Sequence, residues 1–355
     1  MTPASRIGVL TFHRCINYGS YWQARCLVEG LRGLGYEAEL LDHVSPAVDR
    51  AEWRCALSPV LPQRTAPADF PLYAEKARKF FDAFAQLPLS PPFPLDDPAQ
   101  MADYDLVIVG SDEVWNLRHP WYGGKSIFYG DGLRAGRLAS YAASFGNHAV
   151  SEGLPSDWAQ KLQQFDRISI RDENSRQLIE TALEREPEMV LDPVMQFPPA
   201  ASGEPDLDEP YVAIYGHSFP DWFSTGVAQW ARENELMLVS IGYRNGWADA
   251  HWVEAGPRDF ARIMAGAEAV ATNFFHGCVF ALINGKPFVC APSDYRFNKV
   301  RDLAAGVGAS RHLVSAQTPR EDYDALLGQP LDPRIERNIA TLRQRSAAYL
   351  DAVLH

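Results

Sequence analysis

One histidine in the sequence stands where acid–base or phosphate chemistry is easy to arrange. A β-rich run ends at Thr272, and His276 and Gly277 open an apolar helical stretch just after it. The free N–H groups of a helix N-terminus favour an anion, and an imidazole beside them can donate a proton or contact a phosphate. A lone histidine is as often a polar residue bonded to nearby backbone, so both interpretations stay open. Four basic residues downstream could extend the site into a pocket for a small anion, although each alone is an ordinary surface residue: Arg296, Lys299, Arg301 and Arg311.

A second candidate is the segment Gly110–Asn116, which follows a buried apolar run. Asp112 supplies a carboxylate that can bond sugar hydroxyls or accept a hydroxyl proton, and the indole of Trp115 can stack on a sugar face. Ser111 and Asn116 add polar groups beside them. The segment is therefore a candidate edge of a sugar-binding site. The alternative is that Ser111 or Asp112 only caps a helix.

Two further polar positions follow other apolar runs. Arg171 opens a helix whose first turn is acidic, a place where the helix dipole does not favour a cation. It therefore either pairs with Asp172 or Glu173 or binds an anionic ligand. Asn17, which precedes Tyr18, follows the first apolar run. Capping of the next helix is the simpler interpretation of Asn17, and a hydroxyl or anion site is the other.

Several classes of chemistry lack their sequence signatures. No GxGxxG or GxxxxGK[ST] motif indicates a nucleotide-phosphate loop, and no GxSxG motif indicates a nucleophilic serine. No cluster has the spacing of zinc ligands, so neither a metal nor an organic cofactor is expected. The five cysteines form no CxxC pair, which favours free thiols in a reducing compartment.

Length and charge narrow the possible partners. The chain has 355 residues, enough for two domains. Its 45 acidic residues against 33 lysines and arginines give a formal net charge of −12, which disfavours nucleic acids and anionic membranes as general partners. No apolar run has the length of a signal-peptide core or a membrane span, so we expect a cytoplasmic protein.

Short apolar runs alternate with segments of helical period, which predicts two doubly wound, Rossmann-like α/β domains that face each other across a cleft. We expect an N-terminal domain over residues 1–197, with a Pro-rich insertion at 44–100, and a C-terminal domain over 211–332. Residues 198–210 are predicted to form a linker and 333–355 a C-terminal helix. Ligands bind beyond the carboxyl ends of the strands in such sheets, and the main candidate residues follow strand ends. The expected strands are Arg6–Phe12, Glu37–Leu41, Asp105–Val109, Arg137–Tyr141, Arg167–Ile170, Met189–Leu191, Tyr211–Tyr215, Met237–Ile241, Ala269–Thr272 and Phe288–Ala291.

Taken together, these segments resemble the polysaccharide pyruvyl transferase family. The matching blocks occur in order along nearly the whole chain: IGVLTFHRCINYGSYWQARCL, YDLVIVGSDEVWN, SYAASFG, ISIRDENS, VLDPVM and AVATNFFHGCVFALINGKPFV. Each block alone is weakly specific, whereas six in this order indicate the family. The chain departs from the family pattern at Phe274, where serine is usual, and at Cys278, where threonine is common.

The resemblance implies a fold similar to GT-B glycosyltransferases and transfer of pyruvate from phosphoenolpyruvate to two hydroxyls of a glycan or glycolipid precursor, as a cyclic ketal. Phosphoenolpyruvate and a glycan, glycoside or lipid-linked saccharide are then the expected partners, with peripheral membrane association possible through the acceptor. His276 and Asp112 are the predicted catalytic pair. The predicted donor-binding residues are Arg171, His276, Gly277, Arg296 and Lys299, and the predicted acceptor-binding residues are Asn17, Tyr18, Ser111, Trp115 and Asn116.

Two other functions remain open at this point. One is a GT-B-type glycosyltransferase that uses a nucleotide sugar on the same scaffold. The other is a glycan-binding family member that has lost its activity, an idea motivated by the missing hydroxyl at Phe274. The acceptor sugar, the ketal stereochemistry and the oligomeric state do not follow from the sequence.

Overall fold

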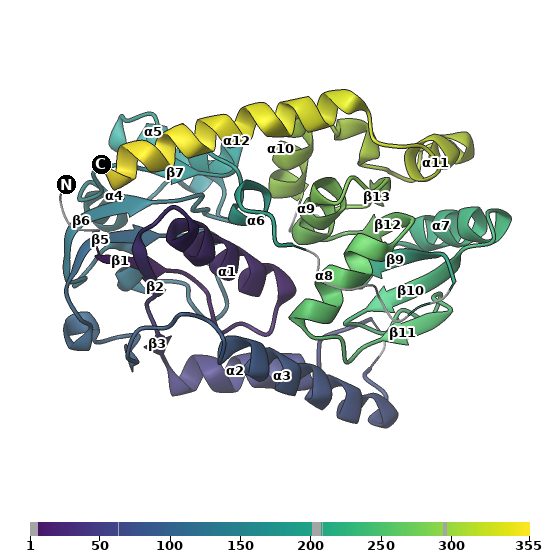
Figure 1. Cartoon of the computed structure of the whole chain (residues 1–355), viewed down its shortest axis with the longest axis horizontal. Helices are drawn as coiled ribbons and strands as arrows, with labels where there is room; N and C mark the ends of the chain where they lie inside the picture. The colour runs from purple at the N-terminus through teal and green to yellow at the C-terminus, as the bar shows by residue number, and fades with distance from the viewer. Residues whose placement is uncertain (1–5, 63, 201–206, 208, 294–296) are drawn as a thin grey trace. The chain divides into compact units, whose positions relative to one another are not determined.

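The computed structural model describes residues 6–62, 64–200, 207, 209–293 and 297–355. Contacts within the chain group it into two compact units. The first unit comprises Met1–Glu52, Gln86–Pro198 and Ala340–His355, and the second comprises Trp53–Ala85 and Pro199–Ile339. Each unit is built around its own parallel sheet (Figure 1).

The sheet of the first unit has the strand order β2–β1–β5–β6. All three pairings are parallel, with Ile7 of β1 opposite Leu106 of β5 and Val107 of β5 opposite Leu138 of β6. The central strands are buried on both faces, as the continuous apolar runs of the sequence predict. The strands are β1 (Arg6–Leu10), β2 (Glu37–Leu40), β5 (Tyr104–Val109) and β6 (Ala135–Ser140), and the short pairs are β3 (His43–Val44) with β4 (Phe93–Pro94) and β7 (Ser169–Ile170) with β8 (Glu188–Met189).

Helices connect and cover these strands. Helix α1 buries Leu27 and Leu31 on its inner face, as a period near 3.6 residues requires, whereas Leu34 at its C-cap is 54% exposed. Ser346 Oγ of α12 donates to the carbonyl oxygen of Leu342 in the same helix and accepts the backbone N–H of Leu191 at 2.9 Å, which ties the last helix to this unit. The helices that contribute to the unit are α1 (Tyr18–Gly33), α4 (Ser156–Leu162), α5 (Glu173–Leu183), α6 (Pro193–Gln196) and the C-terminal part of α12 (Pro333–Leu354).

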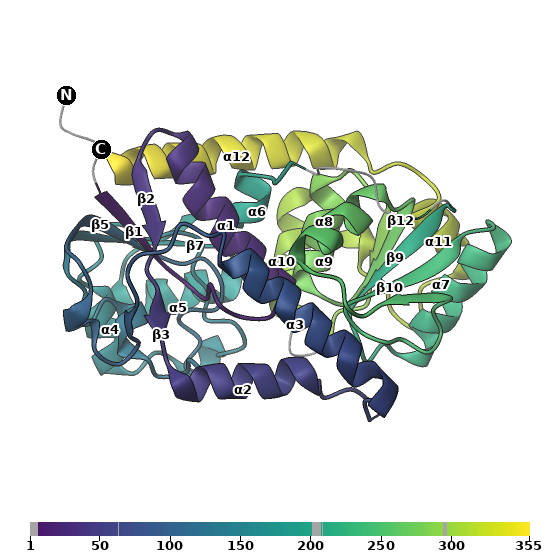
Figure 2. The same ribbon diagram turned by 60° about the horizontal axis from the view of Figure 1, so that its bottom comes forward.

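The second unit has a five-stranded parallel sheet in the order β11–β10–β9–β12–β13. Strand β9 lies at its centre between β10 and β12, as Figure 2 shows. The chain therefore fills one side of β9 before it crosses to the other, and the carboxyl ends of β9 and its neighbours lie at one edge of the sheet. The elements are β9 (Tyr211–Tyr215), β10 (Met237–Ile241), β11 (Ala250–Trp252), β12 (Ala269–Thr272) and β13 (Phe288–Cys290), with α7 (Asp221–Glu233), α8 (Pro257–Gly266), α9 (Phe275–Ile283), α10 (Phe297–Val307) and α11 (Arg320–Leu327).

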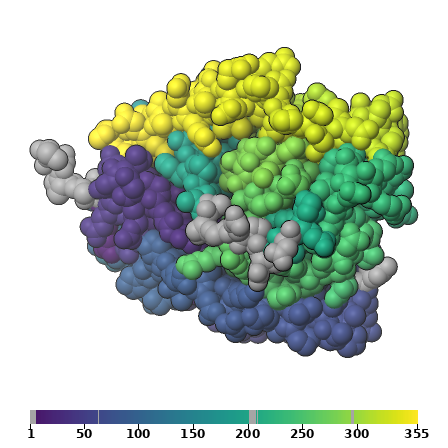
Figure 3. Space-filling view, turned by 45° about the vertical axis from the view of Figure 1, so that its right-hand side comes forward, coloured from purple at the N-terminus to yellow at the C-terminus, as the bar shows by residue number. Residues whose placement is uncertain are grey.

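Part of the Pro-rich segment belongs with the second unit by its contacts. The segment contains α2 (Pro46–Leu57) and α3 (Phe70–Phe84), and the outer side of α3 is exposed at the lower edge of Figure 3. On its inner side, Lys76 Nζ donates to the carbonyl oxygen of Gly242 at 3.0 Å, and Lys79 Nζ lies 3.0 Å from Asp259 Oδ2. The first domain predicted from the sequence carries the whole of 44–100, whereas the contacts of residues 53–85 are made with the second unit. The predicted domain boundaries stay a prediction.

The order of strands and helices follows the sequence expectation closely. Strands Tyr211–Tyr215, Met237–Ile241 and Ala269–Thr272 have the predicted bounds. The helix predicted near Gly277 begins earlier, at Phe275, so that His276 lies inside its first turn. The sequence did not predict helices α2, α4, α6 and α11 or strands β3, β4 and β11, because their short or mixed patterns carry weak periodicity.

A buried histidine in the first unit should make stability depend on pH. His43 is 3% exposed, its Nε2 lies 2.9 Å from the carbonyl oxygen of Thr11, and its ring packs edge-on against His13. Burial, followed by the nearby His13, lowers the pKa of His43 from 6.5 to about 3. The unfolded chain then binds a proton that the folded chain does not, so stability is present above pH 6.5 and is lost as the pH falls toward 3.

We expect the free energy of unfolding to fall by about 2 kcal/mol between pH 7.5 and pH 5 through this histidine alone. His43→Gln keeps a donor for Thr11 but cannot titrate, and it should remove that part of the pH dependence. Urea unfolding of wild type and His43→Gln at the two pH values measures this difference in the free energy of unfolding. The control is His355→Gln at the exposed C-terminus, whose side chain is 71% exposed. Equal pH slopes for wild type and His43→Gln would contradict the prediction.

Candidate active site

The strand ends of the first unit bring separate polar segments together. Strands β1, β5 and β6 run parallel, so the segments that follow them meet at one edge of the sheet. Three contacts show this directly: Ser20 Oγ donates to Asp112 Oδ2 at 2.8 Å, Thr11 Oγ1 donates to the carbonyl oxygen of Ser111 at 2.9 Å, and Arg171 reaches Asp112. Residues spread over 160 positions thus form one polar cluster.

Arg171 is the centre of this cluster. Its Nη1 lies 2.8 Å from Asp192 Oδ2 and its Nη2 lies 3.0 Å from Asp112 Oδ1. The side chains of Arg171 and Asp192 are 1% exposed, whereas that of Asp112 is 13% exposed. Burial disfavours the charged guanidinium, but the carboxylates of Asp112 and Asp192 outweigh this, and the pKa of Arg171 rises above its ordinary value. Arg171 is therefore a permanently charged bridge between two carboxylates.

The pairing partners predicted for Arg171 from the sequence were wrong. Asp172 caps helix α5, because its Oδ1 accepts the backbone N–H of Ser175 at 2.8 Å. Glu173 pairs with Arg176, one turn along the same helix. The neighbours in sequence stabilise helix α5, and the partners of Arg171 are Asp112, in the loop after β5, and Asp192, the N-cap residue of α6.

The charge around Arg171 bears on its predicted contact with an anionic donor. Four carboxylates act on this one guanidinium: Asp112, Asp192, Glu113 and Asp172. Burial raises the pKa of Asp172, with hydrogen bonds from Ser144 and Ser175 opposing it. A surplus of negative charge repels an anion and suits a proton acceptor or a neutral hydroxyl. The geometry therefore favours the ion-pair interpretation of Arg171, and its contact with a donor stays a prediction.

Asp112 is held in one orientation by its neighbours. Besides Arg171 and Ser20, the backbone N–H of Glu113 donates to Asp112 Oδ1 at 2.9 Å. Its backbone is left-handed, with φ at +73°, a conformation that a non-glycine residue adopts at a cost. No helix follows β5 here, so the alternative that Ser111 or Asp112 caps one is wrong. Ser111 is instead buried and donates through Oγ to the carbonyl oxygen of Ala142 at 3.0 Å.

Asn17 acts as the sequence suggested. Its Oδ1 accepts the backbone N–H of Ser20 at 3.2 Å, so it caps α1, and it remains exposed beside the cluster. Tyr18 is 1% exposed in the first turn of the same helix. Of these two predicted acceptor residues, Asn17 alone presents surface that a ligand can reach.

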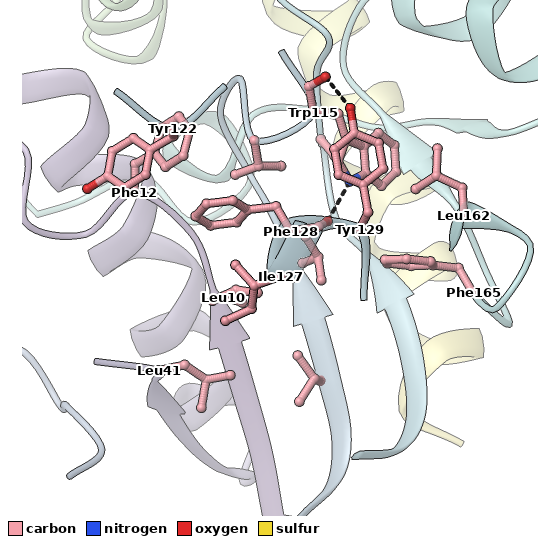
Figure 4. Close-up of a cluster of buried hydrophobic side chains, with 14 of the residues drawn as sticks. Leu10, Phe12, Leu41, Trp115, Tyr122, Ile127, Phe128, Tyr129, Leu162 and Phe165 are labelled. Atoms are coloured by element: carbon pink, nitrogen blue, oxygen red, sulfur yellow. Dashed lines mark hydrogen bonds between the residues drawn. The ribbon is translucent and has the colours of Figure 1, made fainter. Parts of the chain in front are cut away.

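Trp115 lies in the core of the first unit (Figure 4). Its side chain is fully buried, its Nε1 donates to the carbonyl oxygen of Phe128 at 2.8 Å, and Tyr129 Oη donates to its carbonyl oxygen at 2.5 Å. An indole packed on all sides cannot stack on a sugar, so the role predicted for Trp115 does not agree with this structure. Asn116 is also buried, and its Nδ2 donates to Glu113 Oε2 at 2.9 Å and Asn147 Oδ1 at 3.0 Å.

His276 lies on the second unit, in the first turn of α9 at the carboxyl end of β12. Its residue exposure is 9%, and its ring packs edge-on against Phe275. Gly277 is required here by space, because a Cβ would lie 2.0 Å from Thr272 Oγ1. The glycine lets α9 start directly against the strand end, which sets the position of His276.

The two departures from the family pattern are both packed into the interior. Phe274 is 7% exposed, and its ring packs edge-on against Tyr215, His217 and Tyr243. Cys278 is 2% exposed and is a free thiol, like every other cysteine of the chain. Phe274 thus joins an aromatic cluster at the sheet edge, which explains how the site accepts a bulky side chain.

The basic residues predicted to support His276 are placed differently from one another. Arg296 lies outside the described residues. Lys299 is half-buried on α10, a helix that packs against α9. Arg301 pairs with Asp302, and Arg311 is exposed in the short helical turn Ser310–His312. Of the residues predicted to bind the donor, Lys299 therefore lies on a helix that packs against the helix of His276.

Two residues of the first-unit cluster were missed by sequence reasoning. Ser20 donates a hydrogen bond to Asp112, and Asp192 accepts one from Arg171. Each stands inside a block quoted for the family resemblance, and a count of polar residues next to strand ends would have found Asp192. Within the described residues, no group of three or more His, Cys, Asp or Glu side chains could hold a metal ion. Over the same residues, no helix has the length and apolar character needed to cross a membrane.

Comparison with models of known protein families shows which family the chain belongs to. The model of the family described as polysaccharide pyruvyl transferase matches residues 17–295, more than three quarters of the 355 residues. The chain belongs to the polysaccharide pyruvyl transferase family. This confirms the resemblance drawn from the six sequence blocks. The matched range includes Asn17, Asp112, Arg171 and His276.

Solved structures show a similar fold in proteins of distant sequence. A UDP-N-acetylglucosamine 2-epimerase is 12% identical, covers 98% of this chain and 94% of its own, and has a TM-score of 0.54. The S. aureus protein MnaA, solved with UDP, is 11% identical over 94% of this chain and 90% of its own, with a TM-score of 0.51. A putative UDP-N-acetylglucosamine 2-epimerase from Listeria monocytogenes is 11% identical over 96% and 91%, with a TM-score of 0.50.

Similarity at this level concerns the fold alone. Together with the two parallel sheets, it confirms the expected GT-B-like class of Rossmann-like α/β units. No curated protein matches the chain.

Proposed function

We propose that this family member transfers pyruvate from phosphoenolpyruvate to two hydroxyls of one saccharide, forming a cyclic ketal. The observation that carries the proposal is the family match over residues 17–295. Membership supports a transferase that modifies polysaccharides. The donor, the ketal and the residue roles below belong to the proposal.

The proposed reaction balances without a metal, an oxidant or a reductant. A proton adds to the methylene carbon of phosphoenolpyruvate, which makes C2 electron-poor, and one sugar hydroxyl attacks C2. The C2–O bond to phosphate then breaks and a second hydroxyl takes the position of the phosphate. Two hydroxyl protons are released. One returns to the acid that protonated the methylene carbon, and the other leaves with phosphate as hydrogen phosphate.

The residues of the chain suggest separate roles in this scheme. His276 is the proposed proton donor to the methylene carbon, because an imidazolium can donate a proton and the residue stands at a helix N-terminus that favours an anion. Asp112 is the proposed acceptor of a hydroxyl proton, because it is the most exposed carboxylate of the Arg171 pairs. Arg171 is proposed as a positioning residue that fixes the Asp112 carboxylate.

Donor binding tests the proposal first. Phosphoenolpyruvate at 100 times its dissociation constant should raise the free energy of unfolding by about 2.7 kcal/mol, measured as a thermal shift. UDP- and GDP-sugars are the comparison ligands, since MnaA was solved with UDP and shares this fold. Stabilisation by a nucleotide sugar, with no response to phosphoenolpyruvate, would support the glycosyltransferase alternative. No response to any donor would support a lapsed binding protein.

Product analysis tests the ketal itself. The protein is incubated with phosphoenolpyruvate and a panel of glycosides, and phosphate release is measured beside proton NMR of the product. A ketal gives a methyl signal, whereas an enolpyruvyl ether of the same mass gives vinylic protons. The vinylic product, or phosphate release without a saccharide adduct, would contradict the proposed reaction.

A further inference from the structure

The second unit contains a cavity that none of the predicted site residues lines. Its volume is about 260 Å³, somewhat below the roughly 300–1,000 Å³ of sites for drug-sized ligands. One wall is the segment after β9 with the first turn of α7, and another is the loop after β10. The third is the stretch of chain just before α3 and the first turn of that helix. Strands β9 and β10 are adjacent and parallel, so the cavity lies beyond the carboxyl ends of two neighbouring strands, the edge at which open α/β sheets bind ligands.

The walls of the cavity are fixed before any ligand binds. Asn245 Nδ2 donates to the carbonyl oxygen of Gly216 at 3.0 Å and to Ser240 Oγ at 2.9 Å, which ties the two strand-end loops together. Arg244 makes two hydrogen bonds of 2.7 Å to the carboxylate of Asp69, which ties in the third wall. These bonds to Arg244 hold the pKa of Asp69 below its usual range. A ligand therefore meets a preformed site and orders little of it on binding.

The charges that line the cavity cancel. Arg244 and Asp69 neutralise each other, and the remaining ionised groups are one exposed cation, Arg64, and one exposed anion, Asp221. With histidine counted as neutral, the formal charges of the lining residues sum to zero. A phosphate- and carboxylate-bearing donor would lose its hydration here without net attraction. The charge balance favours a neutral ligand that hydrogen-bonds to both signs of charge.

The uncharged groups of the wall suit a sugar. Trp247 and Phe219 are half-buried with their rings perpendicular and their centroids 5.5 Å apart, and Phe219 stacks on Phe223 beneath it. An indole supported in this way offers an apolar face to a pyranose ring. Among the described residues, none accepts a hydrogen bond from Trp247 Nε1, and the buried Thr65 Oγ1 has no hydrogen-bond partner either. Ser224 adds a hydroxyl from α7.

We propose that this cavity binds a neutral sugar unit of an oligosaccharide acceptor, in addition to the sugar that receives pyruvate. The inference rests on the proposed function only where it calls the bound saccharide an acceptor. Binding of a neutral saccharide is a separate property that can be measured without the reaction. Trp247 supplies the stacking face that Trp115 cannot supply, because Trp115 lies in the core. The cavity makes longer glycans better ligands than single sugars.

The test measures saccharide binding without phosphoenolpyruvate, so its failure is distinct from failure of the proposed reaction. Saturation-transfer NMR of the full chain is recorded with lactose, cellobiose and N,N′-diacetylchitobiose. We expect at least one disaccharide to bind, and Trp247→Ala to weaken it by about tenfold or more, the scale of a lost stacking contact in a polar site. Trp222→Ala is the matched control, because Trp222 is a half-buried tryptophan of the same unit that does not line the cavity.

A second variant keeps the test decisive if Trp247→Ala folds poorly. Ser224→Phe fills the cavity from α7 and leaves Trp247 in place, and it should abolish the same binding while circular dichroism stays unchanged. Absence of binding for all three disaccharides, or equal binding by wild type and both cavity variants, overturns the proposal. Loss of phosphoenolpyruvate binding in Trp247→Ala, with saccharide binding intact, also overturns it and assigns the cavity to the donor.

Discussion

Replacement of Arg171 by methionine is expected to lower the free energy of unfolding by about 3–5 kcal/mol, the cost of leaving buried charges without their partner. The guanidinium lies 2.8 Å from Asp192 and 3.0 Å from Asp112, and its side chain is 1% exposed. Methionine fills a similar volume but cannot compensate either carboxylate. Urea unfolding of wild type and variant at pH 7 measures the difference.

Two further variants show whether the loss comes from buried charge. Arg176→Met on α5 removes pairs with Glu173 and Glu180 whose side chains are about one third exposed, and such surface pairs are worth about 0–1 kcal/mol. Asp192→Asn in the Arg171→Met background should restore part of the stability, because it removes one uncompensated charge. If Arg171→Met loses no more stability than Arg176→Met, Arg171 does not act as a buried ion-pair bridge between Asp112 and Asp192.

Arg171→Lys separates the positioning role from donor binding. Lysine keeps the charge but lacks the forked donors that reach two carboxylates at once. If Arg171 positions Asp112, the folded variant should bind phosphoenolpyruvate as wild type does and turn over more slowly. Donor affinity weakened by about 1.5–3 kcal/mol, the scale of a hydrogen bond to a charged group, would instead place Arg171 in the donor site.

Replacement of His276 by alanine should lower turnover by about 10²–10⁴, the usual scale for a positioned proton donor. His276 opens α9 at the end of β12, beside Gly277 and the strand residue Thr272. His276→Gln offers a hydrogen-bond donor without a titrating proton. It should restore donor binding but not turnover if His276 is the acid, and partly restore both if it is a phosphate ligand. Rates and melting temperatures are measured on the same samples.

The rival role for His276 is structural, and its 9% exposure makes a control necessary. His312 is a buried histidine of the same unit whose Nδ1 lies 2.7 Å from the carbonyl oxygen of Phe288, and burial lowers its pKa. His312→Gln should lower stability by about 1–3 kcal/mol and leave turnover per folded molecule unchanged. The same pattern for His276→Ala, with a normal rate, would remove His276 from the site.

Much of the fold follows from local patterns in the sequence. The apolar runs at 211–215, 237–241 and 269–272 became β9, β10 and β12 with the predicted bounds, because a strand buried on both faces needs an unbroken apolar run. Asn17 was identifiable as a helix cap for a similar reason, since a cap bonds the backbone three residues away. The six ordered blocks were enough to indicate the family.

The candidate site was only partly accessible to such reasoning. Parallel strands place their carboxyl ends at one edge, so the sequence could predict that Ser111, Asp112 and Arg171 follow strand ends. It could not predict that Arg171 pairs with Asp112 and Asp192, 59 and 21 positions away, in place of its neighbours. Long-range ion pairs depend on strand order, and no local pattern encodes that order.

The sequence by itself determined most of the strands, the Asn17 cap of α1 and the family, because these depend on residues a few positions apart. Tertiary structure alone decided which polar side chains meet and which aromatic rings are buried. Trp115 and Trp247 have the same chemistry in sequence, yet one is sealed in a core and the other lines a cavity. The reason is physical: burial, charge balance and access to a ligand are properties of surfaces that only form when distant segments pack together.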